Sequence, residues 1–403
     1  MHVVYLVSSA QLGGTEASVF EMIGSLREAH PDWTVRVVTP ADGPLVERLQ
    51  AAGTTVHVVP FPAALARLGE AGGMASVAGR VRFAFAFLRA ALPAVFYSRR
   101  LKRTLASAGP VGVVHAHGFK MQVLAVRALP PGAALVWHVH DYVSPRRVSA
   151  HLLRLFVPQC TVIIVNSMSV ATDVRRVCGP AVRVETVYNA VDLRRFSPDG
   201  PAIDLDALGG AAPAAPQTIR VGLLGTFGRW KGHRVFLRAL AALPRELGIR
   251  GYIIGGPQYE TAGSQESEAS LRRVAAELGL ADTVVFTGPV DDPAGALRAL
   301  DIVVHASTEP EPFGMVIAEG MACGRPMVVA LAGGTPEIVQ DGVDALGHTP
   351  GDASELADRL RQLAADSALR ERIGGEARRS AERRFDRSRL AIELTPLYAA
   401  LPA

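Results

Sequence analysis

Two glutamates, Glu311 and Glu319, stand eight residues apart in the segment EPFGMVIAEG. The first follows an apolar run at residues 302–305, and the second lies in a helical pattern that begins near Phe313 and Gly314. Eight residues of uninterrupted helix would separate the two by about 12 Å. Because Glu311 is still in the loop, both carboxylates can reach one edge of a parallel sheet, where open α/β sheets bind ligands. Carboxylates there can hold hydroxyl groups, while the free helix amides meet phosphate oxygens.

The chemistry of this pair has more than one interpretation. Two glutamates at this spacing usually mark a solvated helix face, but Glu319 lies within the apolar run FGMVIAEGMACG. A charge there is costly unless it is paired or binds something. Two carboxylates could also serve a glycosidase, in which their separation decides retention or inversion. Phosphate-binding features elsewhere in the chain speak against a hydrolase.

The first such feature is a pair of cations, Arg229 and Lys231, in GLLGTFGRWKGH at residues 222–233. Two cations at a strand-to-helix turn can clamp a diphosphate, although they could equally be a solvated surface pair. The second feature is Gly13 and Gly14, which follow the first apolar run and precede an amphipathic helix with Thr15 as the expected N-cap. Paired glycines let the backbone approach a diphosphate closely. The dinucleotide pattern G-x-G-x-x-G is absent at this turn.

Histidines end two further apolar runs. In VVHAHGF, His115 and His117 alternate onto one face, and His117 is nearer the carboxyl end of the strand. In WHVHDY, His138 and His140 end a later strand. A strand-end histidine is usually structural, and His138 and His140 lack the rest of a metal-ligand set at a recognised spacing. We therefore predict no metal site.

These motifs together resemble the retaining, nucleotide-sugar-dependent glycosyltransferases of family 4 (glycosyl transferases group 1). Three features are similar to family motifs: the E-x7-E spacing, the GG-x-E start of the first helix, and the segment VYNAVDLRRFSP at residues 187–198. GTFGRWKG is similar to the family's G-R-x-x-x-W-K-G, with Thr226 in the arginine position and Arg229 as the substitute cation. The resemblance covers nearly the whole chain and is weakest between residues 61 and 110.

The resemblance implies a role for each motif residue. Glu311 would contact the transferred sugar, Glu319 the ribose hydroxyls, and His117 the sugar from the opposite domain. Lys231 would meet the charge of the leaving diphosphate. Catalytic roles thus fall on Glu311, His117 and Lys231. The residues implied in donor binding are Gly13, Gly14, Arg229, Lys231, Phe313, Gly314, Met315 and Glu319. No metal and no cofactor are implied, because cations and helix ends would neutralise the diphosphate.

The elements that must position these residues are strands alternating with helices. Near-continuous Val/Ile/Leu runs indicate strands buried on both faces, at residues 3–7, 35–38, 56–59, 111–115, 134–139, 161–165, 184–188, 220–224, 252–254, 284–286, 302–305 and 327–329. Alternation with helical patterns predicts parallel βαβ units. The fold class is therefore α/β. The resemblance implies GT-B, with two doubly wound, Rossmann-like domains whose parallel sheets face across a cleft.

Chain length and composition predict the domain boundaries. A length of 403 residues predicts two domains. We expect an acceptor-binding domain at residues 1–198, an Ala/Pro/Gly-rich linker at 199–218, and a nucleotide-sugar-binding domain at 219–385. A C-terminal helix at 386–403 would cross back to the first domain.

Composition also limits partners and compartment. Three cysteines without a C-x-x-C pair argue against a disulfide framework and a zinc site. A net charge of +4 without basic blocks does not suggest a nucleic-acid partner. There is no signal-peptide pattern and no apolar run of about 20 residues. We expect a cytoplasmic protein, or one peripheral on the inner face of the membrane.

Residues 80–103 (RVRFAFAFLRAALPAVFYSRRLKR) mix an apolar stretch with seven Arg or Lys residues. They could form a basic amphipathic surface that contacts anionic membrane or a lipid-linked acceptor. The alternative, which we favour slightly from sequence, is a core helix with solvated arginines, interrupted by Pro93.

The function predicted overall is metal-independent, retaining transfer of a sugar from a nucleoside-diphosphate sugar to an acceptor hydroxyl. Assembly of polysaccharide, glycolipid or another glycoconjugate is the expected setting, and a soluble acceptor is nearly as plausible. Two alternatives stay open. A sugar-nucleotide epimerase of the same fold would convert the donor without an acceptor. A degenerate, non-catalytic transferase subunit is conceivable because Thr226 replaces the arginine.

Overall fold

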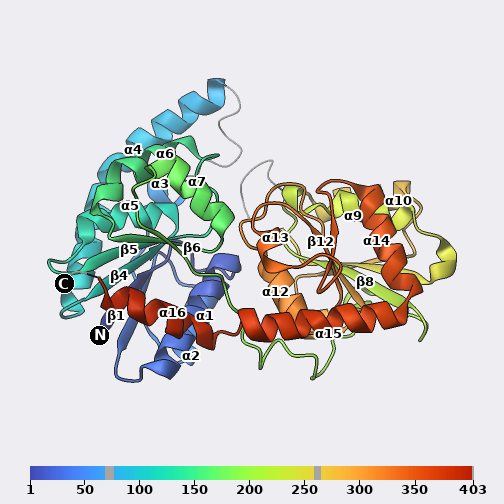
Figure 1. Ribbon diagram of the computed structural model, residues 1–403. Helices are drawn as coiled ribbons and strands as arrows, with labels where there is room; N and C mark the ends of the chain where they lie inside the picture. The colour runs from blue at the N-terminus through green and yellow to red at the C-terminus, as the bar shows by residue number, and fades with distance from the viewer. Residues whose placement is uncertain (69–76, 258–264, 402–403) are drawn as a thin grey trace. The chain divides into compact units, whose positions relative to one another are not determined.

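The computed structural model describes residues 1–68, 77–257 and 265–401 of the chain. These residues form two compact units (Figure 1). Unit 1 comprises residues 1–190 and 387–403, and unit 2 comprises residues 191–386. Each unit contains one parallel sheet with helices on both faces, which is the Rossmann-like, α/β arrangement expected from the strand pattern.

Unit 1 contains a seven-stranded parallel sheet in the order β3-β2-β1-β4-β5-β6-β7. Its strands are β1 (His2–Leu6), β2 (Thr34–Thr39), β3 (Thr55–Val58), β4 (Val113–His117), β5 (Ala134–Val139), β6 (Val162–Val165) and β7 (Val184–Thr186). Alternate side chains of each strand enter two separate cores. One core includes α4 (Val77–Ser107), α5 (Phe119–Ala128), α6 (Arg147–Phe156) and α7 (Met168–Cys178). The other includes α1 (Gly14–Ala29), α2 (Pro44–Ala51) and α16 (Ser388–Ala399).

Unit 2 contains a six-stranded parallel sheet in the order β10-β9-β8-β11-β12-β13. Its strands are β8 (Ile219–Leu224), β9 (Ile249–Ile254), β10 (Val284–Gly288), β11 (Ile302–His305), β12 (Met327–Ala330) and β13 (Leu346–His348). Its longer helices are α9 (His233–Ala241), α10 (Glu268–Glu277), α12 (Met315–Ala322), α14 (Ala353–Ala365) and α15 (Ser367–Arg384). The short strand β13 was not expected from the sequence.

The predicted linker at residues 199–218 folds as part of unit 2. It contains the short helix α8 (Leu205–Leu208), where Asp206 is only 2% exposed. The Asp206 carboxylate accepts bonds from Arg250 Nη1 at 2.9 Å and the Tyr252 hydroxyl at 2.8 Å. A buried carboxylate paired with two strand residues anchors the segment to β9, so its Ala/Pro/Gly composition does not make it a free linker.

Helix α16 packs on α1 within unit 1, with Leu390, Leu394 and Tyr398 buried. Arg389 Nη2 donates to the carbonyl oxygens of Tyr188 and Asn189, which follow β7. The C-terminal segment is therefore fastened to the first unit by apolar contacts and by main-chain hydrogen bonds.

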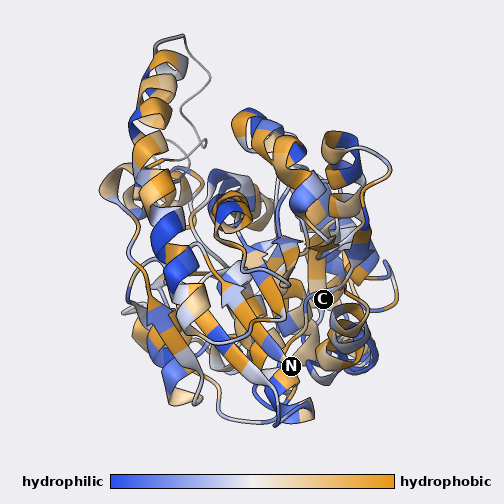
Figure 2. Ribbon diagram, turned by 90° about the vertical axis from the view of Figure 1, so that its left-hand side faces the viewer, coloured by the Kyte–Doolittle hydropathy of each residue, from blue (hydrophilic) through white to orange (hydrophobic). Residues whose placement is uncertain are grey.

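Helix α4 differs in its two halves. Near its C-terminal end, Tyr97, Leu101 and Leu105 are buried in the core of unit 1. Its N-terminal half extends beyond the other helices of the unit (Figure 1 and Figure 2). There an apolar stripe is 57–71% exposed; it consists of Val81, Phe85, Leu88, Leu92 and Phe96. The interpretation of residues 80–103 as an ordinary core helix is therefore wrong for this half, although the Arg80 side chain lies outside the described part.

By length and composition alone, Val81–Ser107 of the same helix could cross a membrane, and 17% of its most apolar stretch is buried. Basic residues interrupt this segment, so it is not an uninterrupted apolar run.

Candidate active site

Lys231 and Glu311 form the charged centre of unit 2. Lys231 Nζ donates to Glu311 Oε1 at 2.9 Å and to Oε2 at 3.0 Å. The two side chains are 23% and 13% exposed. They lie beyond the carboxyl ends of β8 and β11, neighbours in the sheet, which is the edge at which parallel sheets bind ligands.

A close approach of two backbones brings this pair together. After β8 the chain turns through a 3₁₀ segment, η2 (Arg229–Lys231), and Gly232 follows with φ +75°. A Cβ on Gly232 would lie 1.8 Å from the Ala306 carbonyl oxygen, just after β11. The Trp230 carbonyl also accepts a bond from the Thr308 N–H at 2.7 Å. Glycine at this position therefore lets the Lys231 loop reach the Glu311 loop.

Two further residues complete an ion cluster, which we define as Lys231, His305, Ser307 and Glu311. Ser307 Oγ donates to Glu311 Oε2 at 2.8 Å, and His305 Nε2 lies 3.4 Å from the same oxygen. Burial alone would raise the pKa of the Glu311 carboxyl, but the Lys231 ammonium and the His305 ring hold that pKa well below its usual range. Glu311 is therefore a fixed carboxylate. The sequence analysis missed His305 and Ser307, although His305 ends the strand in VVHAST and Ser307 follows two residues later.

The loop after Glu311 is fixed by main-chain bonds. The Glu311 carbonyl accepts from the Gly334 N–H at 2.7 Å, which joins it to the GGTPE loop. Helix α12 begins at Met315 after Gly314, whose φ is +93°. Glu319 lies on α12 and is half-buried. The Glu311 loop and the start of α12 thus follow β11 directly, whereas the predicted role of Glu319 stays a prediction.

Phe313 was expected to contact the donor, and that contact stays a prediction. Phe313 is 2% exposed, and its ring makes an edge contact with Phe385 at a centroid distance of 5.9 Å. Phe313 therefore anchors the loop between Glu311 and Gly314 in the core.

Arg229 is exposed on the same 3₁₀ segment as Lys231. Its charge helps to lower the pKa of the Glu266 carboxyl, after the larger effect of the hydrogen bond from Arg234. Its predicted contact with a diphosphate stays a prediction.

The start of α1 in unit 1 differs from the expectation. The N-cap is Gly13 and the helix begins at Gly14, so Thr15 is not the cap. The Glu16 side chain accepts hydrogen bonds from the N–H groups of Gly13 and of Glu16 itself, while burial raises its pKa to about 7. A diphosphate bound at Gly13 and Gly14 would have to displace this carboxyl group.

The histidine cluster of unit 1 consists of His115, His117, His138 and His140. Parallel pairing sets His117 opposite His138, so the two H-x-H pairs on β4 and β5 lie side by side. His117 Nδ1 is 2.9 Å from His140 Nε2, and His115 Nδ1 is 2.6 Å from the Tyr398 hydroxyl. The His138 and His140 rings stack at 4.0 Å.

Burial decides the charge of this cluster. Desolvation lowers the pKa of His115 and of His140 to about 3, and it holds the pKa of His117 and His138 well below the usual range. His117 is 0% exposed, so its predicted contact with a sugar needs the surrounding rings to move. The sequence showed no further ligand at a recognised spacing from His138, but in the structure His115 and His117 lie beside it.

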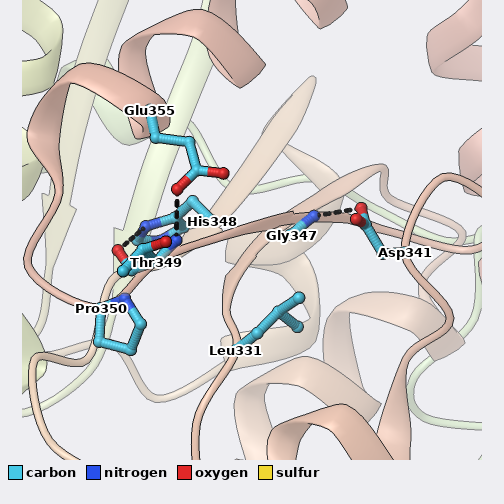
Figure 3. A pocket seen from close by; sticks show the side chains of 7 residues that line it. All are labelled: Leu331, Asp341, Gly347, His348, Thr349, Pro350 and Glu355. Carbon is cyan, nitrogen blue, oxygen red and sulfur yellow. Dashed lines mark hydrogen bonds between the residues drawn. The ribbon is translucent and has the colours of Figure 1, made fainter.

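A small pocket of about 170 Å³ lies beside β13 (Figure 3). Its acidic groups are already bonded: Asp341 accepts from the Gly347 N–H at 2.7 Å and Glu355 from the Thr349 N–H at 2.7 Å (Figure 3). His348, which lines it, reaches the His305 carbonyl oxygen at 3.3 Å. His348 thus connects the lining of this pocket to His305, at the strand end that carries the ion cluster.

Comparison with known proteins identifies the class. Residues 12–195 match the model described as Glycosyltransferase Family 4, and residues 218–366 match Glycosyl transferases group 1. The Anabaena protein Alr3699/HepE, solved in complex with UDP, has a TM-score of 0.77 and 26% identity, with both chains covered completely. Sucrose-phosphate synthase from Thermosynechococcus elongatus shares the fold, with a TM-score of 0.74, 19% identity, and 99% and 98% of the two chains covered. The fold is that of the GT-B glycosyltransferases. The chain belongs to the family 4-like glycosyltransferases.

Curated relatives match over part of their length. The chain is 38% identical over 198 residues to D-inositol 3-phosphate glycosyltransferase of Mycolicibacterium vanbaalenii, covering 46% of this chain and 42% of that protein. It is 27% identical over 250 residues to N-acetyl-alpha-D-glucosaminyl L-malate synthase of Bacillus anthracis, covering 62% of each. The matched part thus spans about half the length of these relatives.

Proposed function

We propose that this protein transfers a sugar from a nucleoside-diphosphate sugar to an acceptor hydroxyl with retention of configuration. The observation that carries the proposal is the Lys231–Glu311 pair at the strand ends of unit 2, within the segment that matches the group 1 model. It places a fixed cation and a fixed carboxylate where a parallel sheet binds its ligand.

Each member of the pair has one chemical task. Lys231 carries three N–H donors, and its two bonds to Glu311 leave one for an oxygen of the donor diphosphate. The Glu311 carboxylate can accept bonds from hydroxyls of the transferred sugar. Glu319 on α12 would accept from ribose hydroxyls, and the amides of Gly314 and Met315 would face the diphosphate.

In the reaction, the bond between the anomeric carbon and the diphosphate oxygen breaks as the acceptor oxygen bonds to that carbon on the same face. The acceptor proton passes to the departing diphosphate. Negative charge develops on that diphosphate, so a positioned Lys231 stabilises the transition state more than the ground state. With Arg229 nearby, this chemistry needs no divalent metal at the diphosphate, and we expect transfer to be unchanged when magnesium is omitted.

We further propose that the donor nucleotide is uridine diphosphate. The support is the full-length similarity, at 25–26% identity, to a protein solved with UDP and with UDP-glucose.

The apolar stripe of α4 supports a membrane-bound setting. Spacings of four, three, four and four residues keep the five side chains on one helix face. The exposed basic residues Arg82, Arg89, Arg99, Arg100, Lys102 and Arg103 accompany the stripe. We propose that this face binds the surface of an anionic membrane that contains a lipid-linked acceptor. A crossing helix is disfavoured, because Tyr97, Leu101 and Leu105 would have to leave the core.

Nucleotide binding tests the proposed transfer. Thermal unfolding is followed with UDP, GDP, ADP and dTDP in turn, each without and with magnesium. A ligand at a hundred times its dissociation constant adds about 2.7 kcal/mol, which is readily measured. We expect a shift with UDP alone that is independent of magnesium and is lost in Lys231→Ala. No shift with any nucleotide would contradict the transferase proposal and favour a non-catalytic subunit.

Vesicle flotation tests the membrane contact separately. The double variant Phe85→Ser, Leu88→Ser should lose binding to anionic vesicles. The control Ile392→Ser removes a side chain that is 74% exposed on α16 and should leave binding unchanged. Failure of the unaltered protein to float with anionic vesicles would remove this part of the proposal.

A further inference from the structure

Five ring nitrogens in the histidine cluster are buried without a hydrogen-bond partner among the described residues. They are His115 Nε2, His117 Nε2, His138 Nδ1, His138 Nε2 and His140 Nδ1. An unpaired buried polar atom costs about 1–3 kcal/mol, so several in one place need a compensating interaction. The proposed transfer reaction uses at most His117, and the rest have no role in it.

The geometry of three of these rings fits one ligand. His115, His117 and His138 are 0%, 0% and 1% exposed, and one nitrogen from each lies within 4.8 Å of the other two. Three imidazoles around a tetrahedral cation with bonds of about 2.1 Å would have nitrogens about 3.4 Å apart. Rotation of the side chains must bring the three nitrogens together: the ring centroids are 4.4–5.3 Å apart, and the ring planes are inclined to one another by 11–36°.

The outer contacts of the rings also follow the pattern of metal ligands. A metal-binding histidine usually bonds its second nitrogen to a fixed partner, which orients the ring. Here His115 Nδ1 faces the Tyr398 hydroxyl, and His117 Nδ1 faces His140 Nε2. Tyr398 in turn contacts the Tyr5 hydroxyl at 2.9 Å. The two Nε2 atoms are thereby left without a hydrogen-bond partner among the described residues.

We propose that His115, His117 and His138 bind one divalent cation of the zinc class in unit 1. Neutral imidazole is the ligand form, and complete burial of the rings favours it. An all-nitrogen set suits Zn²⁺, Co²⁺, Ni²⁺ or Cu²⁺, whereas Mg²⁺ and Ca²⁺ require oxygen ligands. The cation ties β4 to β5 and, through Tyr398, to α16. It is distinct from any magnesium that could assist a diphosphate.

The proposal is tested with the full chain after treatment with EDTA and dialysis. Zn²⁺ binding is measured by competition with a chromophoric chelator, and bound zinc is counted by elemental analysis. We expect one Zn²⁺ per chain and no competition from excess Mg²⁺. Lack of binding by the unaltered protein would overturn the proposal.

Matched variants separate this site from adventitious binding. His138→Asn should weaken Zn²⁺ binding at least about 100-fold. The control His233→Asn alters a histidine outside the cluster that is also buried, 1% exposed, with no hydrogen-bond partner for either ring nitrogen among the described residues. This variant protein should bind Zn²⁺ normally. Equal affinity in His138→Asn and the unaltered protein would overturn the proposal.

A second variant keeps the test decisive if His138→Asn does not fold, as judged by circular dichroism of the metal-free protein. Tyr398→Phe removes only the hydroxyl that orients His115 and should weaken binding about 10- to 100-fold. Unchanged affinity in this variant would contradict the assigned role of His115. The readout is metal binding, so the result is independent of whether the transferase proposal holds.

Discussion

The ion cluster of unit 2 and the histidine cluster of unit 1 both lie at the ends of parallel strands, yet their buried polar groups are satisfied differently. In the ion cluster, Lys231 and Glu311 are both charged, and each Glu311 oxygen accepts at least one hydrogen bond. In the histidine cluster, desolvation keeps the rings neutral and leaves nitrogens unpaired.

This difference indicates what each cluster can do. A paired cation and carboxylate are already organised for a charged, hydroxyl-rich ligand and need little rearrangement when it arrives. Neutral rings with free nitrogens instead gain most from a ligand that supplies positive charge. This difference is consistent with the two proposals, a diphosphate and a sugar in unit 2 and a cation in unit 1.

The largest effect should come from breaking the ion cluster. Glu311→Ala should lower kcat/KM about 10²- to 10³-fold, because it removes the fixed acceptor and releases Lys231 from its position. The control Glu266→Ala removes a carboxylate of similar exposure, 11% against 13%, that pairs with Arg234 in the same unit. Steady-state kinetics with a UDP-sugar should show a large loss for Glu311→Ala alone. Equal losses in both variants would mean that the effect is structural.

Next in size is the backbone contact that builds this cluster. Gly232→Ala should cost about 3 kcal/mol or more of unfolding free energy, because its Cβ would meet the Ala306 carbonyl oxygen at 1.8 Å. Gly248→Ala is the control, since φ there is +61° and nothing lies within 4 Å of the added Cβ. It should cost about 1 kcal/mol. Urea denaturation measures both, and equal costs would exclude the proposed close approach.

A smaller effect should appear in unit 1, at Glu16. Its pKa is about 7 in the folded protein and about 4.5 in the unfolded chain, so the folded state binds the extra proton between these values. Stability from this group is therefore present at low pH and is lost as pH rises from about 4.5 to 7. The loss amounts to about 3 kcal/mol.

Glu16→Gln removes this titration. The variant should match the unaltered protein near pH 4.5 and exceed it in stability at pH 8, as measured by thermal unfolding at each pH. The histidine cluster acts in the opposite direction, because unfolded histidines bind protons below about pH 6.5. That contribution is common to both proteins and cancels in their difference. A constant difference at all pH values would contradict the raised pKa.

The smallest effect is expected at Arg229. Arg229→Ala should raise the KM for the donor less than about tenfold, because an exposed cation is screened by solvent. Lys231→Ala should lower kcat far more. A loss at Arg229 as large as that at Lys231 would mean that Arg229 does replace the arginine that is missing at Thr226.

The sequence by itself determined much of the fold and part of the candidate site. Every strand range expected from apolar runs overlaps a strand in the described residues, because a strand buried on both faces leaves a local signal. The three-residue strand β13 lies in DALGHTP and gave no such run. Glu311 and Lys231 were found because their motifs are contiguous in the chain.

Tertiary structure alone decided which groups meet and which are covered. His305 and Ser307 matter because they contact Glu311, and Asp206 fixes the presumed linker because Arg250 and Tyr252 lie against it. The two H-x-H pairs become one cluster only through the pairing of β4 with β5. The apolar side chains at the start of α4 are exposed because the core of unit 1 ends before them. Periodicity describes a single element, whereas burial and pairing depend on neighbours far away in sequence.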